Sequence, residues 1–559
     1  MDINIRVAGE AGQGVKTTGS LLVGAFAHMG LHVLASQSYM SRIRGGLNWF
    51  DVRVGDRELF GGRESADLLV ALTKIAAEVL RGQLAPGGRC VLDSPAGPAD
   101  IPVAFEQAAR EAGGSALMAN TVAAGAVFAV LGYAVVGLCA YLREQFAGKG
   151  QEIIDKNISC ARRGAELVGR QGACIPGPVG SGVPKTVCSG ADAVAIGAAT
   201  AGLRFYTAYP MTPSTAVLTY LAQHAESYGM VVEQAEDEIA AINMACGAAY
   251  AGVPAMTGTS GGGFALMVEG VSLAGMLELP VVILVGQRPG PATGMPTRTA
   301  QQDLRFILHA GHGEFPRAIF APGTISQAYE LTRRAMETAH RYQTPVFILT
   351  DQFLMDLEAT VAALDGQARP IDRCIVTGSP DYARYALVEG GVSPRAVPGG
   401  ESFVVVDSDE HGQDGHLSED LAVRIAQQDK RMAKLGGLTA EAMAPEYYGP
   451  DGAETLLVAW GSTFGPAREA ADIVADKGGS AAVLHFAQVW PLNVPAARQR
   501  IAGARRIVCV EGNQTAQFAS LLREAGLIGD CEHILRYDGM PFTGQEIAAR
   551  LERAGGRRA

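Results

Sequence analysis

The chain has 559 residues, a formal net charge of −11 and 48% hydrophobic residues. A chain of this length is too long to fold around a single hydrophobic core, so we expect three or four domains of roughly 150 residues each. The acidic charge argues against nucleic acid or an anionic membrane surface as a partner. Seventy glycines favour an α/β fold with many tight turns between strands and helices.

Nine cysteines are spread along the chain, and no two have C-x-x-C spacing. This usage is typical of a reduced, cytoplasmic protein, and it excludes an iron–sulfur cluster held by the usual local cysteine spacing. The first residues enter a strand without a basic and then apolar leader, so we expect no signal peptide. Residues 116–142 are apolar and uncharged, but they are rich in Gly and Ala and contain Asn120. We interpret them as a buried helical hairpin rather than a membrane span.

Strand and helix patterns alternate over the first 160 residues. A helix is predicted over 15–29, and strands are predicted over 3–9, 32–38, 50–56, 67–73 and 89–95. This alternation implies a mostly parallel, doubly wound sheet, which we assign to a first domain over 1–170. Residues 171–189 are rich in Pro and Gly and are predicted to be a linker.

Two further α/β units are predicted downstream, over 190–360 and 451–559. Between them, residues 361–450 form a connecting region with few strand patterns. The predicted fold class is therefore α/β, with several doubly wound, mostly parallel-sheet domains. Because such sheets host many chemistries, the fold alone leaves the function open.

The glycine-rich segment 7–19 follows a strand and precedes a helix, where backbone N–H groups can bind an anion. Val15 separates Gly14 from Lys16, which breaks the Walker A pattern, and no glycine takes the third place of the dinucleotide fingerprint. Two interpretations stay open. The segment is either a turn that lets the helix pack closely or an anion site formed by Gly12, Gly14 and Lys16.

A second group of cations follows at Arg42 and Arg44, which stand directly before Gly45 and Gly46. Two guanidinium groups beside flexible backbone would hold a phosphate-bearing ligand well. A solvated charged turn explains the same pattern.

Residues 205–224 change from an apolar strand to a helix through a turn in which two prolines flank Thr212. Proline restricts the backbone there, and we expect Ser214 or Thr215 to cap the helix. The N-terminus of such a helix favours an anion.

An acidic helix start and a glycine run come next. Glu236, Asp237 and Glu238 are predicted in the first turn of a helix, where they complement the helix dipole. Downstream, residues 258–262 match G-x-S-x-G, so a serine hydrolase acting through Ser260 is an alternative function. Such an enzyme would take its acid and base from the downstream residues Asp303, His309 and His312.

Seven segments together carry a resemblance to a known family: "AYPMTPST", "EQAEDEIAAINMACGAAYAG", "TGTSGGGFALMVEG", "GPATGMPTRTAQQDL", "HGEFPR", "SDEHGQDGH" and "YDGMPFT". The chain resembles the 2-oxoacid:ferredoxin oxidoreductases. It looks like their alpha subunit, of the 2-oxoglutarate type, with the gamma domain fused at its N-terminus. The resemblance implies a gamma-type domain, then a pyrimidine-binding domain of thiamine diphosphate enzymes, and last a transketolase C-terminal-like domain.

The resemblance also implies a reaction. A 2-oxo acid, best guessed as 2-oxoglutarate, would be oxidatively decarboxylated with coenzyme A to acyl-CoA (succinyl-CoA) and carbon dioxide, through thiamine diphosphate, and ferredoxin would accept the electrons. A second alternative function is another thiamine diphosphate enzyme subunit that transfers no electrons.

The chain contains no G-D-G segment, which in thiamine diphosphate enzymes anchors Mg²⁺ and the diphosphate. The resemblance therefore implies that this chain holds only the pyrimidine half of the cofactor site. A beta subunit would supply the diphosphate half with Mg²⁺ and a [4Fe-4S] cluster. The expected assembly is a heterotetramer, a dimer of alpha–beta heterodimers, with no nucleic acid and no membrane as partner.

Individual roles follow from the same resemblance. Glu238 is expected to hydrogen-bond the aminopyrimidine ring of the cofactor, with Glu236 as the fallback. Thr212, together with Tyr209 and Pro210 of the same turn, is expected to contact the substrate.

Arg298 is expected to pair with a substrate carboxylate, and Arg288 is the second choice. No residue of this chain is expected to bind a metal. In this family the N-terminal domain lies over the coenzyme A site, so four residues noted above are expected to contact coenzyme A: Gly12, Gly14, Arg42 and Arg44.

Overall fold

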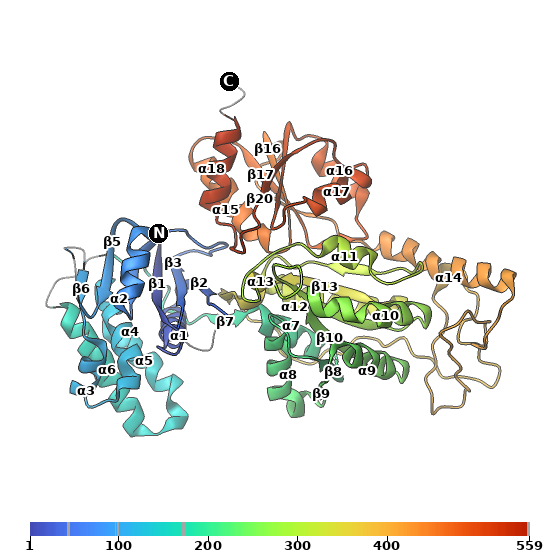
Figure 1. Ribbon diagram of the computed structural model, residues 1–559, viewed down its shortest axis with the longest axis horizontal. Helices are drawn as coiled ribbons and strands as arrows, with labels where there is room; N and C mark the ends of the chain where they lie inside the picture. The colour runs from blue at the N-terminus through green and yellow to red at the C-terminus, as the bar shows by residue number, and fades with distance from the viewer. Residues whose placement is uncertain (42–44, 95–96, 98–99, 170–174, 556–559) are drawn as a thin grey trace. The chain divides into compact units, whose positions relative to one another are not determined.

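The protein is described by a computed structural model that covers residues 1–555 except 42–44, 95–96, 98–99 and 170–174 (Figure 1). Its strands form three sheets of eight, seven and five strands, with helices packed against them. The chain divides into two compact units. The first comprises 1–189, 356–363 and 543–545, and the second comprises the rest. The predicted α/β class is confirmed.

The first unit contains the eight-stranded sheet in the order β6-β5-β4-β1-β3-β2-β14-β7. Its elements are β1 (Asp2–Glu10), α1 (Val15–His28), β2 (His32–Ser38), β3 (Leu47–Gly55), β4 (Ala66–Ala71), α2 (Lys74–Leu80), β5 (Leu84–Leu92), β6 (Asp100–Pro102), α3 (Phe105–Glu111), α4 (Ala119–Val130), α5 (Val135–Gln145), α6 (Gln151–Gly169), β7 (Thr186–Ser189) and β14 (Glu358–Val361).

This sheet is mixed rather than mostly parallel. The successive pairs β6–β5, β5–β4 and β4–β1 are parallel, whereas β3 pairs antiparallel with both β1 and β2. The reason is the short connection between Ser38 and Leu47, because a parallel crossover needs about a dozen residues or more. A distant strand, β14, joins β2 and β7, also antiparallel.

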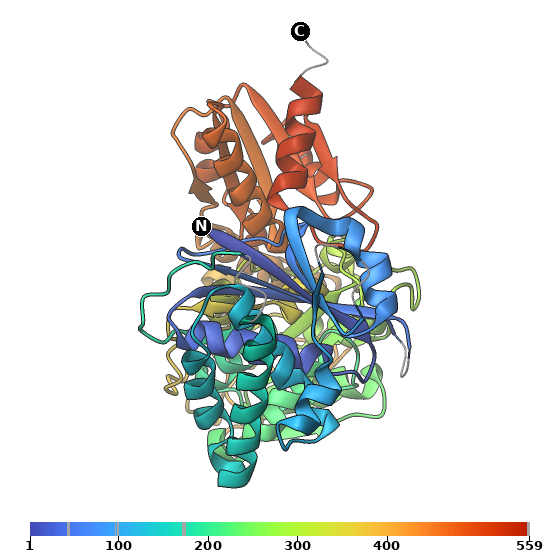
Figure 2. The ribbon, with the colours of Figure 1, turned by 90° about the vertical axis from the view of Figure 1, so that its left-hand side faces the viewer.

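Helices cover both faces of the first sheet (Figure 2). α1, α4, α5 and α6 pack on one face around a large apolar cluster, and α2 packs on the other face around a smaller one. The apolar stretch 116–142 forms α4 and α5, as predicted. α4 and α6 approach each other closely at Gly125. A Cβ at this position would lie 2.0 Å from the Ala161 carbonyl oxygen, so only glycine permits this packing.

No single helix in the described part of the chain is long and apolar enough to cross a membrane. One bent pair, Phe105–Glu111 with Ala116–Val130, meets the criteria of length and composition together.

The second unit contains the other two sheets, in the orders β18-β12-β13-β11-β10-β8-β9 and β15-β17-β16-β19-β20. Its elements are α7 (Gly190–Thr200), β8 (Phe205–Ala208), α8 (Thr215–Tyr228), β9 (Val231–Gln234), α9 (Glu238–Tyr250), β10 (Ala255–Ser260), α10 (Gly261–Met276), β11 (Val281–Gln287), α11 (Leu304–His309), β12 (Ala318–Phe320), α12 (Ile325–Tyr342), β13 (Val346–Asp351), α13 (Gln352–Asp356), α14 (Leu421–Ala440), β15 (Glu446–Tyr448), β16 (Thr455–Trp460), α15 (Phe464–Asp476), β17 (Ala481–Phe486), β18 (Gln488–Trp490), α16 (Val494–Ile501), β19 (Arg506–Glu511), α17 (Gln517–Glu524), β20 (Glu532–Leu535) and α18 (Gly544–Gly555).

Both sheets of the second unit are parallel except for one edge strand each. β18 pairs antiparallel with β12, and β15 pairs antiparallel with β17. Since β18 belongs in sequence to the last part of the chain, this pairing ties the two sheets together. A single apolar cluster also runs through both of them and includes Phe264, Phe347, Trp460 and Phe486.

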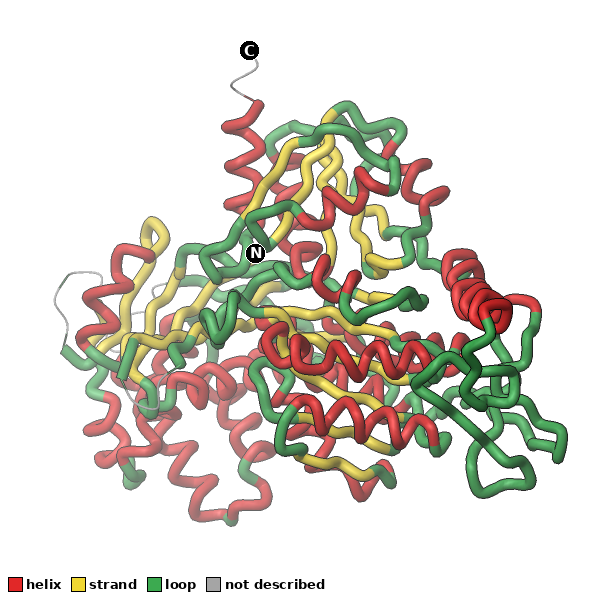
Figure 3. Tube along the Cα trace, turned by 45° about the vertical axis from the view of Figure 1, so that its right-hand side comes forward, coloured by secondary structure: helices red, strands yellow, loops and turns green. Residues whose placement is uncertain are grey.

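The connecting region before α14 is mostly loop, as its weak strand patterns predict (Figure 3). A buried ion cluster holds α14 against the second sheet domain. Glu278 contacts Lys430 Nζ at 2.6 Å and Lys434 Nζ at 2.5 Å, and all three side chains are at most 2% exposed. Burial alone would raise the pKa of Glu278, but Lys434 and Lys430 lower it to about 2. The carboxylate therefore stays ionised and satisfies both lysines.

Candidate functional site

Four neighbouring parallel strands of the second unit, β11, β10, β8 and β9, end at the same edge of their sheet. Ser260 is the last residue of β10, and the segments that follow the other three strands carry Arg288, Thr212 and Glu238. Ligands of open α/β sheets bind at this carboxyl edge. The structure thus brings together the proline turn, the acidic helix start and the glycine run, which are separate in the sequence.

The turn after β8 is fixed by backbone contacts. The Thr212 carbonyl oxygen accepts a hydrogen bond from Arg288 Nη1 at 3.0 Å. Ser214 is the N-cap residue of α8, but its hydroxyl donates to the Met211 carbonyl at 2.8 Å and does not cap the helix. The expectation of a side-chain cap at Ser214 or Thr215 was therefore wrong. The Thr215 and Val217 backbone N–H groups donate instead to the Met211 and Ser214 carbonyls.

The two other predicted residues of this turn differ in exposure. Tyr209 is 40% exposed and Pro210 is half-buried, as is Thr212. All three lie between β8 and α8, at the carboxyl edge described above.

The acidic segment has three different environments rather than one helical turn. Asp237 is the N-cap residue of α9 and accepts a hydrogen bond from the Ala240 backbone N–H at 2.7 Å. Glu236 is exposed and precedes the helix. Glu238 is the first residue of α9 and is only 3% exposed. Its Oε1 atom is buried and has no hydrogen-bond partner within the described residues.

A buried carboxylate oxygen without a partner costs free energy. It persists where a ligand supplies the missing donor, so Glu238 marks a binding position. The exposed Glu236 has no such property, so the geometry favours Glu238 over its fallback.

The glycine run at the start of α10 lies directly against this carboxylate. A Cβ at Gly263 would lie 2.4 Å from Glu238 Oε1 and 2.2 Å from Thr259 Oγ1. A Cβ at Gly261 would lie 2.4 Å from Asp303 Oδ2. Only glycine fits at these two positions without displacing a carboxylate.

Ser260, the residue of the hydrolase alternative, is fully buried. Its hydroxyl lies 2.6 Å from Met211 Sδ, the only hydrogen-bond partner found for it in the described chain. A serine nucleophile needs a base within hydrogen-bond reach, and a thioether cannot accept its proton in that role. The geometry gives the hydrolase alternative no support.

Arg288 and Arg298 lie on the loop that follows β11. Arg288 contacts Thr212, as described, whereas Arg298 Nη1 lies 3.5 Å from Met540 Sδ. Burial lowers the pKa of both guanidinium groups. The same loop is tied to the third sheet domain, since the Thr299 backbone N–H donates to the Gly539 carbonyl at 3.1 Å.

Asp303 at the end of this loop is a site residue that sequence reasoning considered only as a hydrolase acid. Its Oδ2 atom is buried beside Gly261 without a hydrogen-bond partner in the described structure. Burial raises its pKa to about 6. Nothing in the local sequence distinguished Asp303 from an exposed aspartate, so the fold was needed to show its burial.

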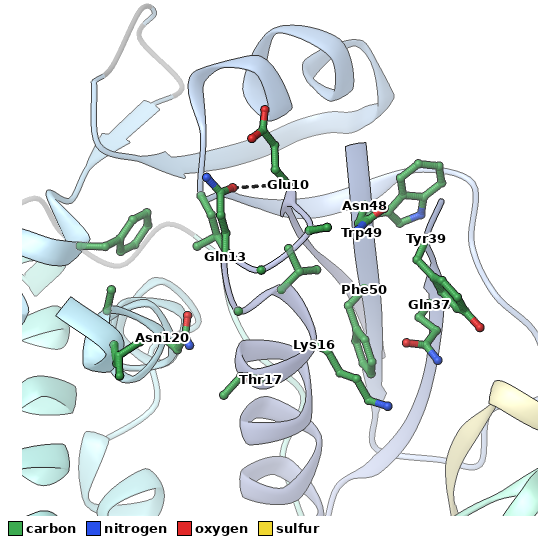
Figure 4. Close-up of a pocket in the computed structure, with 18 of the residues that line it drawn as sticks. Glu10, Gln13, Lys16, Thr17, Gln37, Tyr39, Asn48, Trp49, Phe50 and Asn120 are labelled. Atoms are coloured by element: carbon green, nitrogen blue, oxygen red, sulfur yellow. Dashed lines mark hydrogen bonds between the residues drawn. The ribbon is translucent and has the colours of Figure 1, made fainter. Parts of the chain in front are cut away.

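The first unit has a cavity of about 670 Å³ beside its glycine loop (Figure 4). The loop joins β1 to α1, and Gly12 and Gly14 have φ angles of +88° and +79°, which favour glycine. α1 begins without a side-chain cap, and its first residues, Lys16 among them, line the cavity. The loop therefore presents uncapped N–H groups and a cation to the same space.

Polar and aromatic side chains form the other walls of this cavity, from β2, β3 and α4. They include Gln37, Tyr39, Asn48, Trp49 and Asn120 (Figure 4).

Asn120 is a polar residue in the apolar stretch 116–142, and its contacts with the glycine loop and α1 account for a polar side chain there. A Cβ at Gly14 would lie 2.3 Å from Asn120 Nδ2, and Asn120 Oδ1 accepts a hydrogen bond from Thr18 Oγ1 at 3.2 Å. The predicted contacts Gly12 and Gly14 thus line the cavity, whereas Arg42 and Arg44 lie outside the described residues.

The burial of Asp303 predicts a pH dependence of stability. Between about pH 4 and pH 6 the folded chain keeps a proton that the unfolded chain releases, so this group lowers stability as pH rises through that window. Two pKa units correspond to about 3 kcal/mol. Asp303→Asn should therefore raise the thermal midpoint at pH 7 and leave it nearly unchanged at pH 4.

Scanning calorimetry of wild type and variant at both pH values measures this difference. Asp451→Asn, at an exposed ion pair with Arg500, is the control and should change little at either pH. A loss of stability in Asp303→Asn at pH 7 would contradict the inferred penalty.

Three family models match successive parts of the chain. Residues 4–167 match pyruvate ferredoxin/flavodoxin oxidoreductase. Residues 196–430 match the thiamine diphosphate-binding part of pyruvate flavodoxin/ferredoxin oxidoreductase, and residues 448–551 match the transketolase C-terminal domain.

Similar proteins match over nearly the whole length. The alpha subunit of a 2-oxoacid:ferredoxin oxidoreductase from a Sulfolobus species is 30% identical over 98% of this chain and 96% of its own. The 2-oxoglutarate oxidoreductase subunit KorA of Mycobacterium tuberculosis is 28% identical over 99% of this chain and 91% of its own.

A solved structure is similar to the same extent. It is the 2-oxoglutarate:ferredoxin oxidoreductase from Magnetococcus marinus with 2-oxoglutarate, coenzyme A and succinyl-CoA bound, at 30% identity and a TM-score of 0.92 over 99% of both chains. The resemblance noted from the motifs is confirmed: the chain belongs to the 2-oxoacid:ferredoxin oxidoreductases, as an alpha subunit that carries a gamma-like domain at its N-terminus.

Proposed function

We propose that this subunit serves the oxidative decarboxylation of 2-oxoglutarate with coenzyme A to succinyl-CoA and carbon dioxide, with electrons passed to ferredoxin. The buried Oε1 atom of Glu238, which has no hydrogen-bond partner among the described residues, carries the proposal. The choice of 2-oxoglutarate is supported by the names of two similar proteins, the Mycobacterium tuberculosis subunit and the Magnetococcus marinus enzyme.

Glu238 fits the pyrimidine half of a thiamine diphosphate site. Its Oε1 atom, which has no partner among the described residues, would accept a hydrogen bond from the aminopyrimidine ring. When bound, the cofactor supplies the carbanion chemistry that allows a 2-oxo acid to lose carbon dioxide. Glu238 itself would hold the ring and favour its imino tautomer.

Thr212 would contact the carboxylate or carbonyl oxygen of the 2-oxo acid. Arg288 fixes the backbone of this half-buried residue, which lies just before α8, so the turn would offer the Thr212 hydroxyl to an anion. Tyr209 and Pro210 would form the wall of the same site.

Arg298 would pair with a carboxylate of the substrate, because a guanidinium group can hold both oxygens. Its partial burial makes pairing with an anion favourable. Arg288, which donates to the Thr212 carbonyl, is the second choice.

A beta subunit would complete the site. We expect it to supply the diphosphate half with Mg²⁺ and a [4Fe-4S] cluster, because the chain lacks the G-D-G segment and the cysteine spacings that these groups require. The proposed assembly is a dimer of alpha–beta heterodimers. A cytoplasmic location is supported by the eight described cysteines, which are all free.

The cavity of the first unit would hold phosphate groups of coenzyme A. Its glycine loop, its uncapped helix start and Lys16 suit an anion, and Trp49 and Tyr39 offer flat surfaces to an adenine ring. Glu10 and Glu106 also line the cavity and would repel phosphate. The phosphates would therefore lie toward the loop and α1.

The substrate proposal is tested with the alpha subunit co-purified with its beta subunit. Coenzyme A-dependent reduction of a viologen dye is measured with 2-oxoglutarate, pyruvate, and branched-chain and aryl 2-oxo acids. The highest kcat/KM is expected for 2-oxoglutarate. A preference for another 2-oxo acid would contradict the substrate, and no oxidation of any would contradict the function.

Thr212→Ala should lower kcat/KM for the 2-oxo acid by about 10- to 100-fold, the loss expected for one hydrogen bond to a charged group. The thermal midpoint should change by no more than about 2 °C. Thr219→Ala is the matched control, because Thr219 is exposed on the outer side of α8 and bonds only within its helix. An equal loss of kcat/KM in both variants would contradict a contact between Thr212 and the substrate.

Lys16→Ala should raise the KM for coenzyme A by about 3- to 10-fold and leave the KM for the 2-oxo acid unchanged, since an exposed charge pair contributes about 1 kcal/mol. Lys74→Ala is the control. That lysine is exposed at the start of α2, pairs with Glu78 and does not line the cavity. If both variants raise the KM for coenzyme A alike, or if neither does, coenzyme A binds elsewhere.

A further inference from the structure

Two cysteines and a histidine meet at the edge of the third sheet, remote in sequence from every predicted site residue. Cys509 lies on β19, and Cys531 and His533 lie at the start of β20. The two Sγ atoms are 3.7 Å apart, and Cys531 Sγ is 4.0 Å from His533 Nε2. All three potential ligand atoms lie within 4.8 Å of one another.

The strand register creates this group. β19 and β20 are parallel, and Cys509 is directly opposite His533. Cys531 is two residues before His533, so its side chain points to the same face of the sheet. Three side chains from two neighbouring strands are thereby directed to one point.

We propose that Cys509, Cys531 and His533 bind a divalent thiophilic metal ion of the zinc type. In a tetrahedral zinc site, two sulfurs at about 2.3 Å from the metal lie roughly 3.8 Å apart, and sulfur and nitrogen ligands lie roughly 3.6 Å apart. The two sulfur atoms are 3.7 Å apart, close to the first value. Cys531 Sγ and His533 Nε2 are 4.0 Å apart, slightly more than the second. Only small side-chain movements are needed to bring the three ligands onto one ion.

The site is accessible from solvent, so a metal ion can enter it and a water molecule can serve as the fourth ligand. Cys509 is 1% exposed and forms the floor of the site, Cys531 is half-buried and His533 is exposed. Two thiolates neutralise a divalent ion, so the filled site carries no net charge at the sheet edge. β20 is the edge strand, and a bound ion would fasten it to β19.

A disulfide is the competing use of the two thiols. Cys531 lies diagonally from Cys509 rather than opposite it. A disulfide would require the two sulfur atoms to approach from 3.7 Å to about 2.05 Å. The histidine would also have no role in a disulfide. The geometry therefore favours the metal.

The test uses the full chain, freed of metal with a chelator and kept reduced under anaerobic conditions. Titration with Co²⁺ should saturate at one ion per chain and give a thiolate-to-cobalt charge-transfer band with the strong visible bands of tetrahedral Co²⁺. Zn²⁺ should displace the cobalt and raise the thermal midpoint of the chain by several degrees.

Cys531→Ser and His533→Ala should each weaken Co²⁺ binding by about 100-fold or more, because loss of a direct ligand exceeds the 10- to 100-fold cost of losing an outer partner. Both positions are near the surface, so both variants should fold. Cys374→Ser is the matched control, since this cysteine is half-buried in the connecting region, and its Sγ donates to the Asp372 carbonyl at 3.8 Å.

Three results would overturn the proposal. The first is the absence of stoichiometric tetrahedral Co²⁺ in the wild-type chain. The second is retention of the cobalt bands in Cys531→Ser, and the third is their equal loss in Cys374→Ser. In a separate experiment, the Zn²⁺-saturated chain is exposed to molecular oxygen as the two-electron oxidant; a Cys509–Cys531 disulfide that forms there would assign the thiols to redox chemistry instead.

Discussion

The second unit depends on one steric constraint, the close approach of the α10 glycines to two buried carboxylates. Gly263 faces Glu238 Oε1 and Gly261 faces Asp303 Oδ2, and at both positions a Cβ would lie 2.4 Å from the oxygen. This approach is possible because β8, β9, β10 and β11 end together, so the segments that follow them converge. The backbone of α10, rather than side chains, therefore packs against the two carboxylates.

Burial of these carboxylates lowers the folding stability of the chain on its own. Glu238 Oε1 is buried without a donor, and burial raises the pKa of Asp303 to about 6. Functional sites commonly carry such costs, because a ligand or partner later supplies the missing interaction. The membership of this chain in a family of multisubunit oxidoreductases fits that arrangement. The first unit shows the same principle, with an uncapped helix start and Lys16 facing an open cavity.

Much of the fold could be predicted from local pattern. Alternating apolar residues predicted β1 to β5, and the Gly- and Ala-rich stretch predicted the pair α4 and α5. The antiparallel half of the first sheet was missed, because strand direction depends on which distant strands pair, and β14 arrives from more than 300 residues away. In the site, Glu238 and Thr212 were identifiable by resemblance. The partnerless state of Glu238 and the burial of Asp303 required the fold, as did the meeting of Cys509 with His533.

The central claim is that Glu238 holds the aminopyrimidine ring of thiamine diphosphate in a site completed by a beta subunit. Circular dichroism of the alpha–beta complex titrated with thiamine diphosphate and Mg²⁺ tests it directly, because the imino tautomer of the bound ring has its own near-ultraviolet band. The account predicts that this band forms in the wild-type complex and is lost in Glu238→Gln, while the cofactor still binds. Persistence of the band in Glu238→Gln would contradict the account.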